Sequence, residues 1–199
     1  GDGVSGFYIY GFQLEQKPHA TSYIPTAGAT ETRVAETCTN AGNVDTFNST
    51  EGVFFVEIAS LSNSGNYRLI CLSDGTTSNR LFIGLRQNTG YIYYFFIVNG
   101  STSASHITST TSLNFSKVAL KWKANDFAFW INGSEVATSP SGSSFSANTL
   151  NTLQMNEGDG AGFDFYGKIK GLATYNRAFT DTELYTITST QYSAYSGMV

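Results

Sequence analysis

The chain carries little charge. Lysine, arginine, aspartate and glutamate make up only 13% of its 199 residues, and the formal net charge is −4. Binding to nucleic acid needs clustered lysine and arginine, so we expect no nucleic-acid partner. The longest apolar runs, 53–58 and 91–98, are far too short to span a bilayer, so we expect no membrane insertion. No signal peptide is visible, and because the chain starts at Gly1 rather than at methionine we expect it to be part of a longer protein.

Cysteine is also scarce, with only Cys38 and Cys71 present. Two interpretations stay open, a structural disulfide or two buried thiols, because a free cysteine behaves as a small apolar residue. No histidine stands at ligand spacing to either cysteine, so the pair alone is not expected to bind a metal.

Aromatic residues and glycines are plentiful, at 15% and 20 residues respectively. This composition favours strands and turns over helices. Turn residues such as Asn-Gly and Asp-Gly recur at short intervals after residue 51, and many short strands between frequent turns predict an all-β sandwich or barrel. The expected strands are 53–59, 67–73, 80–87, 91–98, 117–123, 127–131, 135–138 and 167–175.

The first part of the chain differs from the rest. Residues 6–15 alternate and predict a strand, and the polar stretch that follows contains Pro18 and Pro25 and is expected to be extended. We therefore expect residues 1–45 to be a leader or connector with one strand packing on the sandwich, and residues 46–199 to form the sandwich domain. The segment Thr180–Glu183 has the pattern of a capping box, which predicts a short C-terminal helix.

Alternation along the strands predicts which side chains face the core. The expected core residues are Leu81, Ile83 and Leu85 in one strand, Val118, Leu120 and Trp122 in another, and Leu184 and Ile187 facing the sandwich from the helix. In 167–175 both Ile169 and Leu172 are expected to point inward, which requires a β-bulge near Gly171.

The sequence Asn132-Gly133 predicts a type I′ turn between two strands. That turn would pair Trp130 with Glu135, and Phe129 with Val136. Phe129 and Val136 would then face the core, and Trp130 would stand beside a carboxylate on the outer face of the sheet. This outward pair is the most function-like feature of the sequence.

Two linked stretches, 117–137 and 165–184, resemble the paired signature of laminin-G-like, concanavalin A-like jelly rolls. The turn Trp130–Gly133 comes first, and a Gly-x-Ile strand at Gly167–Ile169 then leads into Tyr175–Glu183, in the order that this family shows. The resemblance implies an all-β, antiparallel β-sandwich (a jelly roll, concanavalin A-like) with one short C-terminal helix.

A second resemblance involves residues 11–38, which are similar to segments of phage tail and fibre proteins and of modular carbohydrate-binding proteins. It implies a location on a virion surface, or secreted and extracellular. In the sandwich, Lys170 occupies a position where the family often has an acidic residue, so no calcium ligand is expected there.

Carbohydrate recognition needs flat aromatic faces flanked by polar groups. The candidate carbohydrate-binding residues are Trp130, Glu135, Lys121, Phe82, Arg86 and Tyr93. The run 91–98 is apolar on both faces and leaves open whether Tyr93 or Tyr94 points outward. The outward surface itself has three interpretations: a sugar platform, a face covered by the leader or by another subunit, or ordinary surface.

The loop 156–164 carries three carboxylates among glycines. A plain glycine-rich turn is favoured, and Asp159 and Asp164 are the ligands we would expect if the loop binds Ca²⁺. The segment Glu157-Gly-Asp159 is the only near match to the Glu-x-Asp-x-x-Glu strand of laminarinase-like relatives, and it lacks the third carboxylate. We therefore do not expect an enzyme, and sugar binding requires no cofactor.

The sequence thus predicts a non-catalytic, lectin-like module of a phage tail or fibre protein, or of an extracellular carbohydrate-active protein, with a poly- or oligosaccharide as its partner. The alternative is a structural or assembly domain of a virion fibre, for which a homotrimer is expected. A glycoside hydrolase or lyase ranks third.

Overall fold

The structure is a computed structural model that describes residues 4, 6, 11–14, 23–32, 41–63 and 65–189. The chain divides into two compact units, Gly1–Thr37 and Cys38–Val199. This division lies a little before the predicted boundary at residues 45 and 46, and an isolated bridge between Ala41 and Leu153 ties residue 41 to the second unit. In the expected strand 6–15 the described residues, 6 and 11–14, have no strand conformation, and the other residues of that strand lie outside the described ranges.

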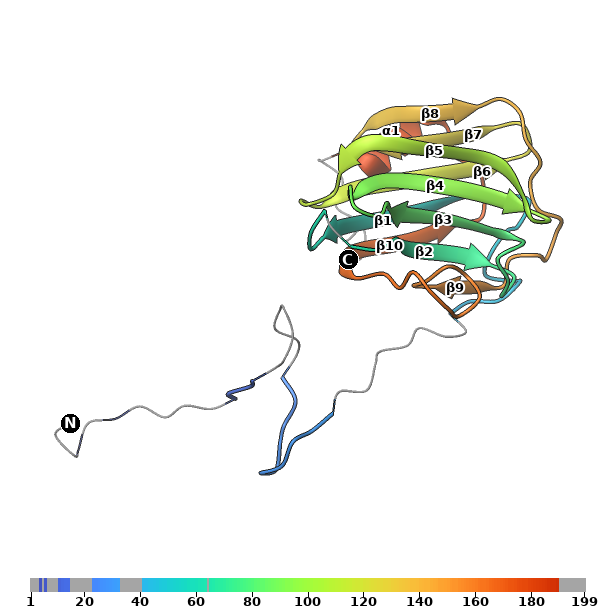
Figure 1. The fold of residues 1–199 in the computed structure, drawn as a ribbon. Coiled ribbons are helices and arrows are strands. Elements are labelled where there is room, and N and C mark those ends of the chain that lie inside the picture. The colour runs from blue at the N-terminus through green and yellow to red at the C-terminus, as the bar shows by residue number, and fades with distance from the viewer. Residues whose placement is uncertain are drawn as a thin grey trace, which may run out of the picture. The chain divides into compact units, whose positions relative to one another are not determined.

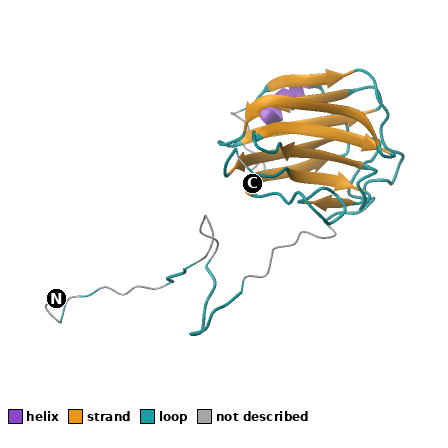
Figure 2. Ribbon diagram, in the orientation of Figure 1, coloured by secondary structure: helices purple, strands orange, loops and turns teal. Residues whose placement is uncertain are grey.

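The described part of the second unit is a sandwich of two five-stranded antiparallel sheets with one helix, which confirms the predicted fold class (Figures 1 and 2). Its elements are β1 (Glu51–Ser60), β2 (Arg68–Ser73), β3 (Arg80–Leu85), β4 (Tyr91–Val98), β5 (Ser101–Thr111), β6 (Ser116–Lys123), β7 (Phe127–Ile131), β8 (Ser134–Ser139), β9 (Thr152–Gln154), β10 (Gly167–Tyr175) and α1 (Asp181–Thr188). None of the described residues belongs to a helix long and apolar enough to cross a membrane.

The two sheets differ in what lies on their outer faces. The first has the strand order β10-β1-β6-β7-β8, and α1 packs behind β6, β7 and β8 (Figure 1). We call it the helix-covered sheet. The second has the order β5-β4-β3-β2-β9 and carries no helix among the described residues. We call it the open sheet.

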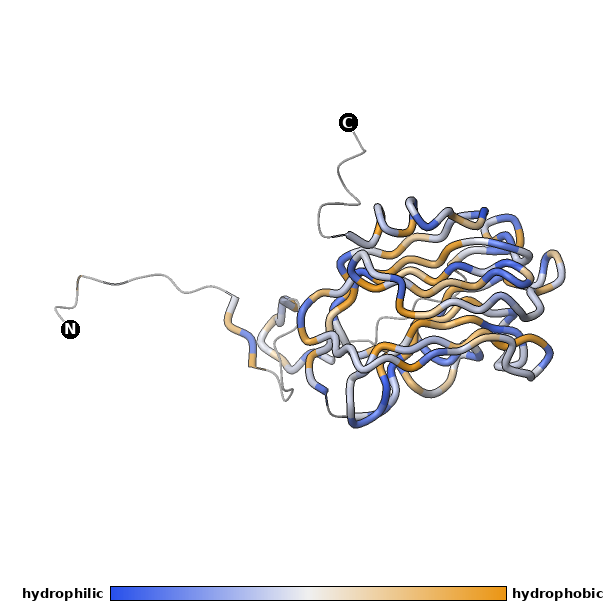
Figure 3. Tube along the Cα trace, turned by 90° about the horizontal axis from the view of Figure 1, so that it is seen from above, coloured by the Kyte–Doolittle hydropathy of each residue, from blue (hydrophilic) through white to orange (hydrophobic). Residues whose placement is uncertain are grey.

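The core fills the space between the sheets, where apolar residues recur along the strands (Figure 3). Every core residue predicted from alternation in the two best-patterned strands is confirmed and almost fully buried: Leu81, Ile83, Leu85, Val118, Leu120 and Trp122. Trp122 also donates its indole N–H to the Ser49 carbonyl, 3.2 Å away, so the polar atom of this buried ring is satisfied.

The β7–β8 hairpin is close to the prediction. Asn132 and Gly133 both have positive φ, 50° and 80°, as a type I′ turn requires. Trp130 pairs with Glu135, which confirms that part of the register. The predicted pairing of Phe129 with Val136 is wrong, because the register shifts between Phe129 and Trp130, and Phe129 lies opposite Ala137. Val136 is the extra residue of this irregularity and still packs against the core.

The bulge expected in β10 is present. Glu57 of β1 lies opposite Gly171, and the next residue, Ile58, lies opposite Ile169, so Lys170 is the unpaired residue. Leu172 packs against the core as predicted. Ile169 lies opposite the inward-facing Ile58 but is 39% exposed, because β10 is an edge strand.

The C-terminal helix begins as the sequence predicts. The Thr180 hydroxyl accepts a hydrogen bond from the Glu183 backbone N–H, and the Glu183 carboxylate accepts one from the Thr180 N–H. Leu184 and Ile187 are buried against the helix-covered sheet. The Arg177 guanidinium beside Glu183, together with the capping N–H, lowers the pKa of that carboxyl to about 2.

Two strands have no counterpart in the sequence prediction, β5 and β9. β5 is rich in serine and threonine, and most of its side chains are exposed because it forms an edge of the open sheet. An edge strand buries little apolar surface, so its sequence resembles that of a loop. β9 has only three residues and is held by pairing with β2.

Candidate functional site

The six candidate carbohydrate-binding residues lie on opposite outer faces of the sandwich. The helix-covered sheet carries Trp130, Glu135 and Lys121. Phe82 and Tyr93 belong to the open sheet, and Arg86 directly follows its strand β3. The structure therefore brings the six residues together as two groups of three rather than as one site.

On the helix-covered sheet, Trp130 lies beneath α1. It belongs to a buried cluster with Leu184 and Ile187, and only 8% of its surface is exposed. Its indole N–H has no hydrogen-bond partner among the described residues. Glu135 is exposed, whereas Lys121 is buried and ion-paired with Asp126 at 2.6 Å. A ring covered by a helix offers little flat surface for stacking against a sugar.

On the open sheet, an aromatic cluster occupies the outer face of β3 and β4. The register places Tyr94 in the core and Tyr93 on the outer side, which settles the question left open by the sequence. Phe82 stacks against Phe95 with centroids 5.7 Å apart and planes at 20°, and it meets Tyr93 edge-on at 5.5 Å. Phe82 and Tyr93 are buried, whereas Phe95 and Tyr67 are half-buried, so Phe95 and Tyr67 are the rings that the cluster presents to solvent.

Burial has an electrostatic consequence within this cluster. It raises the pKa of the Tyr93 phenol well above its ordinary value, and the nearby Tyr67 adds to the shift. Tyr93 therefore stays neutral throughout the physiological range, and its ring acts as an apolar base for the surface above it.

Two arginines flank the cluster and differ in the contacts that their side chains make. The Arg80 guanidinium lies 5.3 Å from the centre of the Phe82 ring and forms an ion pair with Glu157 at 3.7 Å. Arg86 is exposed, and its side chain forms no ion pair or hydrogen bond within the described part of the chain. Arg86 is therefore the cation of this face that is available to a ligand.

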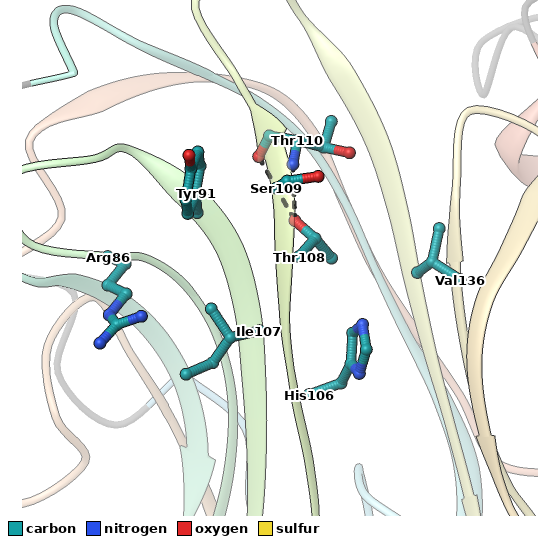
Figure 4. A pocket seen from close by; sticks show the side chains of 8 residues that line it. All are labelled: Arg86, Tyr91, His106, Ile107, Thr108, Ser109, Thr110 and Val136. Atoms are coloured by element: carbon teal, nitrogen blue, oxygen red, sulfur yellow. Dashed lines mark hydrogen bonds between the residues drawn. The ribbon is translucent and has the colours of Figure 1, made fainter.

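A surface pocket of about 660 Å³ adjoins the aromatic cluster at the edge formed by β5 (Figure 4). Arg86, Tyr91 and Ile107 line it from the outer side, and His106 and Val136 lie on the other side of the β5 ribbon. Pockets of this size commonly hold small ligands in proteins. The candidate site comprises this pocket and the outer surface of Phe95, which lies four residues along β4 from Tyr91.

The β9–β10 loop, residues 155–166, closes the other side of the aromatic cluster. The Phe163 ring meets Tyr67 edge-on at 5.4 Å, and the Phe163 carbonyl accepts a hydrogen bond from the Leu69 N–H. A Cβ atom on Gly158 would lie only 2.7 Å from the Cys71 sulfur, so this loop passes directly over β2. Its close packing on the sheet makes it a fixed wall of the site.

The same loop contains the two residues named as calcium ligands. The Asp159 carboxylate accepts a hydrogen bond from the Ala161 N–H at 2.9 Å, and Asp164 lies 3.5 Å from the Tyr166 hydroxyl. No group of three or more histidine, cysteine, aspartate or glutamate side chains suited to a metal occurs among the described residues. Calcium binding by this loop stays a prediction.

Cys71 lies beneath this loop. It is fully buried and forms no disulfide within the described part of the chain, and Cys38 falls outside the described residues. Desolvation raises the pKa of the Cys71 thiol far above its ordinary value. The thiol therefore packs as a small apolar group under the aromatic cluster and is not a nucleophile at neutral pH.

Several residues of this site escaped the sequence prediction, chiefly Phe95, Tyr91, His106 and Ile107. The sequence held a signal for Tyr91 and Phe95: once Tyr93 points outward, alternation along β4 places both of them on the same face. Ile107 pairs with Tyr93 across to β5, and this strand was not foreseen.

The two-sheet sandwich, with one outer face covered by a helix and an aromatic cluster on the other, belongs to a widespread class of jelly-roll domains. The model of the concanavalin A-like lectin/glucanases superfamily matches residues 36–184. Since this match spans well over half of the sequence, the chain belongs to that family. None of the curated protein sequences matches the chain.

Several solved structures have a similar fold. The carbohydrate-binding module CBM40 of the Ruminococcus gnavus IT-sialidase, bound to α2,3-sialyllactose, has a TM-score of 0.59 at 16% identity, over 78% of this chain and 97% of that one. A leech intramolecular trans-sialidase gives 0.57 at 19% identity, over 73% of this chain and 24% of the enzyme. A pentraxin from Limulus polyphemus gives 0.55 at 16% identity, over 76% and 74%. At these identities the likeness concerns the fold.

Proposed function

We propose that the chain is a non-catalytic carbohydrate-binding module and that it binds glycan on the outer face of the open sheet. The observation that carries this proposal is that a half-buried aromatic ring, Phe95, and an exposed cation, Arg86, lie on the same side of the open sheet, and that Arg86 lines a pocket. Aromatic rings stack against the apolar faces of sugars, and charged or polar groups fix the sugar's orientation.

The similar structures support a carbohydrate ligand. The R. gnavus module has been solved with α2,3- and with α2,6-sialyllactose, and its match to this chain covers 97% of the module. Sialyllactose bears a carboxylate, for which the Arg86 guanidinium is a suitable partner. Sialylated oligosaccharides are therefore the first glycans to test.

This proposed binding surface differs from the one around Trp130 that the sequence suggested. The rings that stack lie on β3 and β4, and the helix-covered sheet takes no part in this site. We further propose that the module acts outside the cell, on a virion surface or in a secreted protein, and the support for this is the resemblance of residues 11–38 to phage and carbohydrate-binding proteins.

A glycan array followed by titration calorimetry tests the proposal. The array should include both sialyllactoses, laminarin, xylan, alginate and bacterial surface polysaccharides. Phe95→Ala and Arg86→Gln should each weaken binding of the selected glycan by about tenfold, as expected when an anchoring ring or a charged hydrogen bond is lost. Tyr185→Ala removes a ring that is 55% exposed on α1 and serves as the matched control.

No binding to any glycan would refute the proposal. A stable trimer in sedimentation, combined with no glycan binding, would instead favour an assembly domain whose aromatic face is buried between subunits. Release of reducing ends from a bound polysaccharide would contradict the non-catalytic assignment.

A further inference from the structure

The outer face of the helix-covered sheet extends beyond α1 toward the end of β1. There Ala59 pairs with Lys168 of β10, and Glu57 pairs with Lys117 of β6. Phe115 immediately precedes β6, whose first residue lies opposite Ile58, so alternation places Phe115 beside Ala59 on the outer face.

The side chains at this end form a basic and aromatic surface. Phe115 is 44% exposed, and the Lys170 ammonium lies 5.9 Å from the centre of its ring. Lys168 and Lys170 are both exposed, whereas Ala59 between Phe115 and Lys168 is only 2% exposed. We define the basic–aromatic patch as Phe115, Lys168 and Lys170, with Ala59 as its floor.

The patch is positive on a chain whose net charge is −4. Glu57, whose side chain is 10% exposed, lies 3.0 Å from the Lys170 ammonium. The Lys168 ammonium has no ion pair with any described residue. The exposed charge of the patch is therefore cationic, and it stands next to an open aromatic ring.

We propose that the basic–aromatic patch is a second binding site, separate from the one on the open sheet, and that it takes an anionic polysaccharide. Charge complementarity supplies the attraction, and the Phe115 ring supplies a flat surface for the apolar face of a sugar. A polymer with repeated carboxylates can contact both lysines at once, which a single neutral sugar cannot.

The proposal is tested by the affinity of the full chain for polygalacturonate at low and at physiological salt. Two comparison polymers separate the contributions: fully methyl-esterified polygalacturonate keeps the sugar rings and loses the charge, and polyglutamate keeps the charge and has no sugar ring. We expect binding to polygalacturonate that weakens as salt rises, and much weaker binding to both comparison polymers.

The variants Lys168→Gln and Phe115→Ala change exposed side chains and are expected to fold. The double variant should bind polygalacturonate about tenfold more weakly, because it loses an exposed ionic contact and a stacking surface. Lys123→Gln removes the same charge from an exposed position at the opposite end of the same sheet and should change binding by less than about twofold.

Three results would overturn the proposal: no binding to polygalacturonate at low salt, equal binding to polyglutamate, or an equal loss in Lys123→Gln. Each is distinct from a failure at the open sheet, because the open sheet is judged by the loss of the array-selected glycan in Phe95→Ala and Arg86→Gln, and the patch by the loss of polygalacturonate in the double variant.

Discussion

Shortening Leu184 to alanine tests whether α1 is an integral cover of the sandwich. Leu184 is fully buried and packs with Trp130 and with Val53 and Phe55 of β1. Truncating a buried leucine to alanine costs about 2–5 kcal/mol, from lost transfer free energy plus the cavity left behind. We expect about 3 kcal/mol for Leu184→Ala, since a terminal helix can partly collapse onto the gap.

For a domain of this size such a loss lowers Tm by about 6–12 °C. Urea denaturation followed by tryptophan fluorescence measures the change in the free energy of unfolding, because Trp122 is buried between the sheets and Trp130 is buried beneath α1. The neighbouring residue on the same helix provides the control. Tyr185 is 55% exposed, so Tyr185→Ala should change the free energy of unfolding by less than about 0.5 kcal/mol.

Fluorescence quenching is a second readout, and it reports whether α1 shields Trp130 from solvent. In the native protein Trp122 and Trp130 are 1% and 8% exposed, so a soluble quencher should reach neither. Leu184→Ala should increase quenching by loosening the helix over Trp130. If Leu184→Ala were as stable and as weakly quenched as Tyr185→Ala, α1 would not cover this face, and Trp130 would again be a candidate for sugar stacking.

Two further predictions concern packing and pH. Gly52→Ala should lower the free energy of unfolding by about 3 kcal/mol, because a Cβ there would lie 2.5 Å from the Trp122 ring and 2.6 Å from the Tyr175 carbonyl oxygen. Urea denaturation measures the change, and an unchanged midpoint would contradict this packing. Hydrogen bonds with Arg177 are the main reason why the pKa of Glu183 is lowered to about 2. Because this pKa is below its ordinary value of about 4.5, the stabilisation by the ionised carboxylate is fully present above pH 4.5 and is lost as the pH falls toward 2. Glu183→Gln should therefore have a lower Tm than the parent at pH 7 and the same Tm near pH 2, and a difference that persists at pH 2 would refute the assignment.

Local signals in the sequence were sufficient for much of the fold. Alternation in 80–86 and 117–123 identified core side chains correctly, since a strand with one buried face has only one workable register. Asn132-Gly133 fixed the pairing of Trp130 with Glu135 because a two-residue turn leaves no freedom. The same rule failed one residue further on, where Val136 is accommodated as a bulge that no short-range pattern marks.

The candidate site depended on information that is not local. Trp130 faces outward, as the sequence predicted, yet a helix more than fifty residues later in the chain covers it. Alternation also could not decide between Tyr93 and Tyr94, because both faces of β4 are apolar: one lies against the core and the other carries the aromatic cluster. Only the packing of the two sheets distinguishes them.

The central claim is that glycan binds on the open sheet over Phe95, and the most direct test maps the bound glycan by amide chemical-shift changes in NMR spectra of the full chain. With the glycan selected on the array, we predict that the largest changes fall on β3, β4 and β5, around Phe95 and Arg86, and that they disappear in Phe95→Ala. Changes confined to β7, β8 and α1, with Phe95→Ala binding as tightly as the parent, would contradict the account.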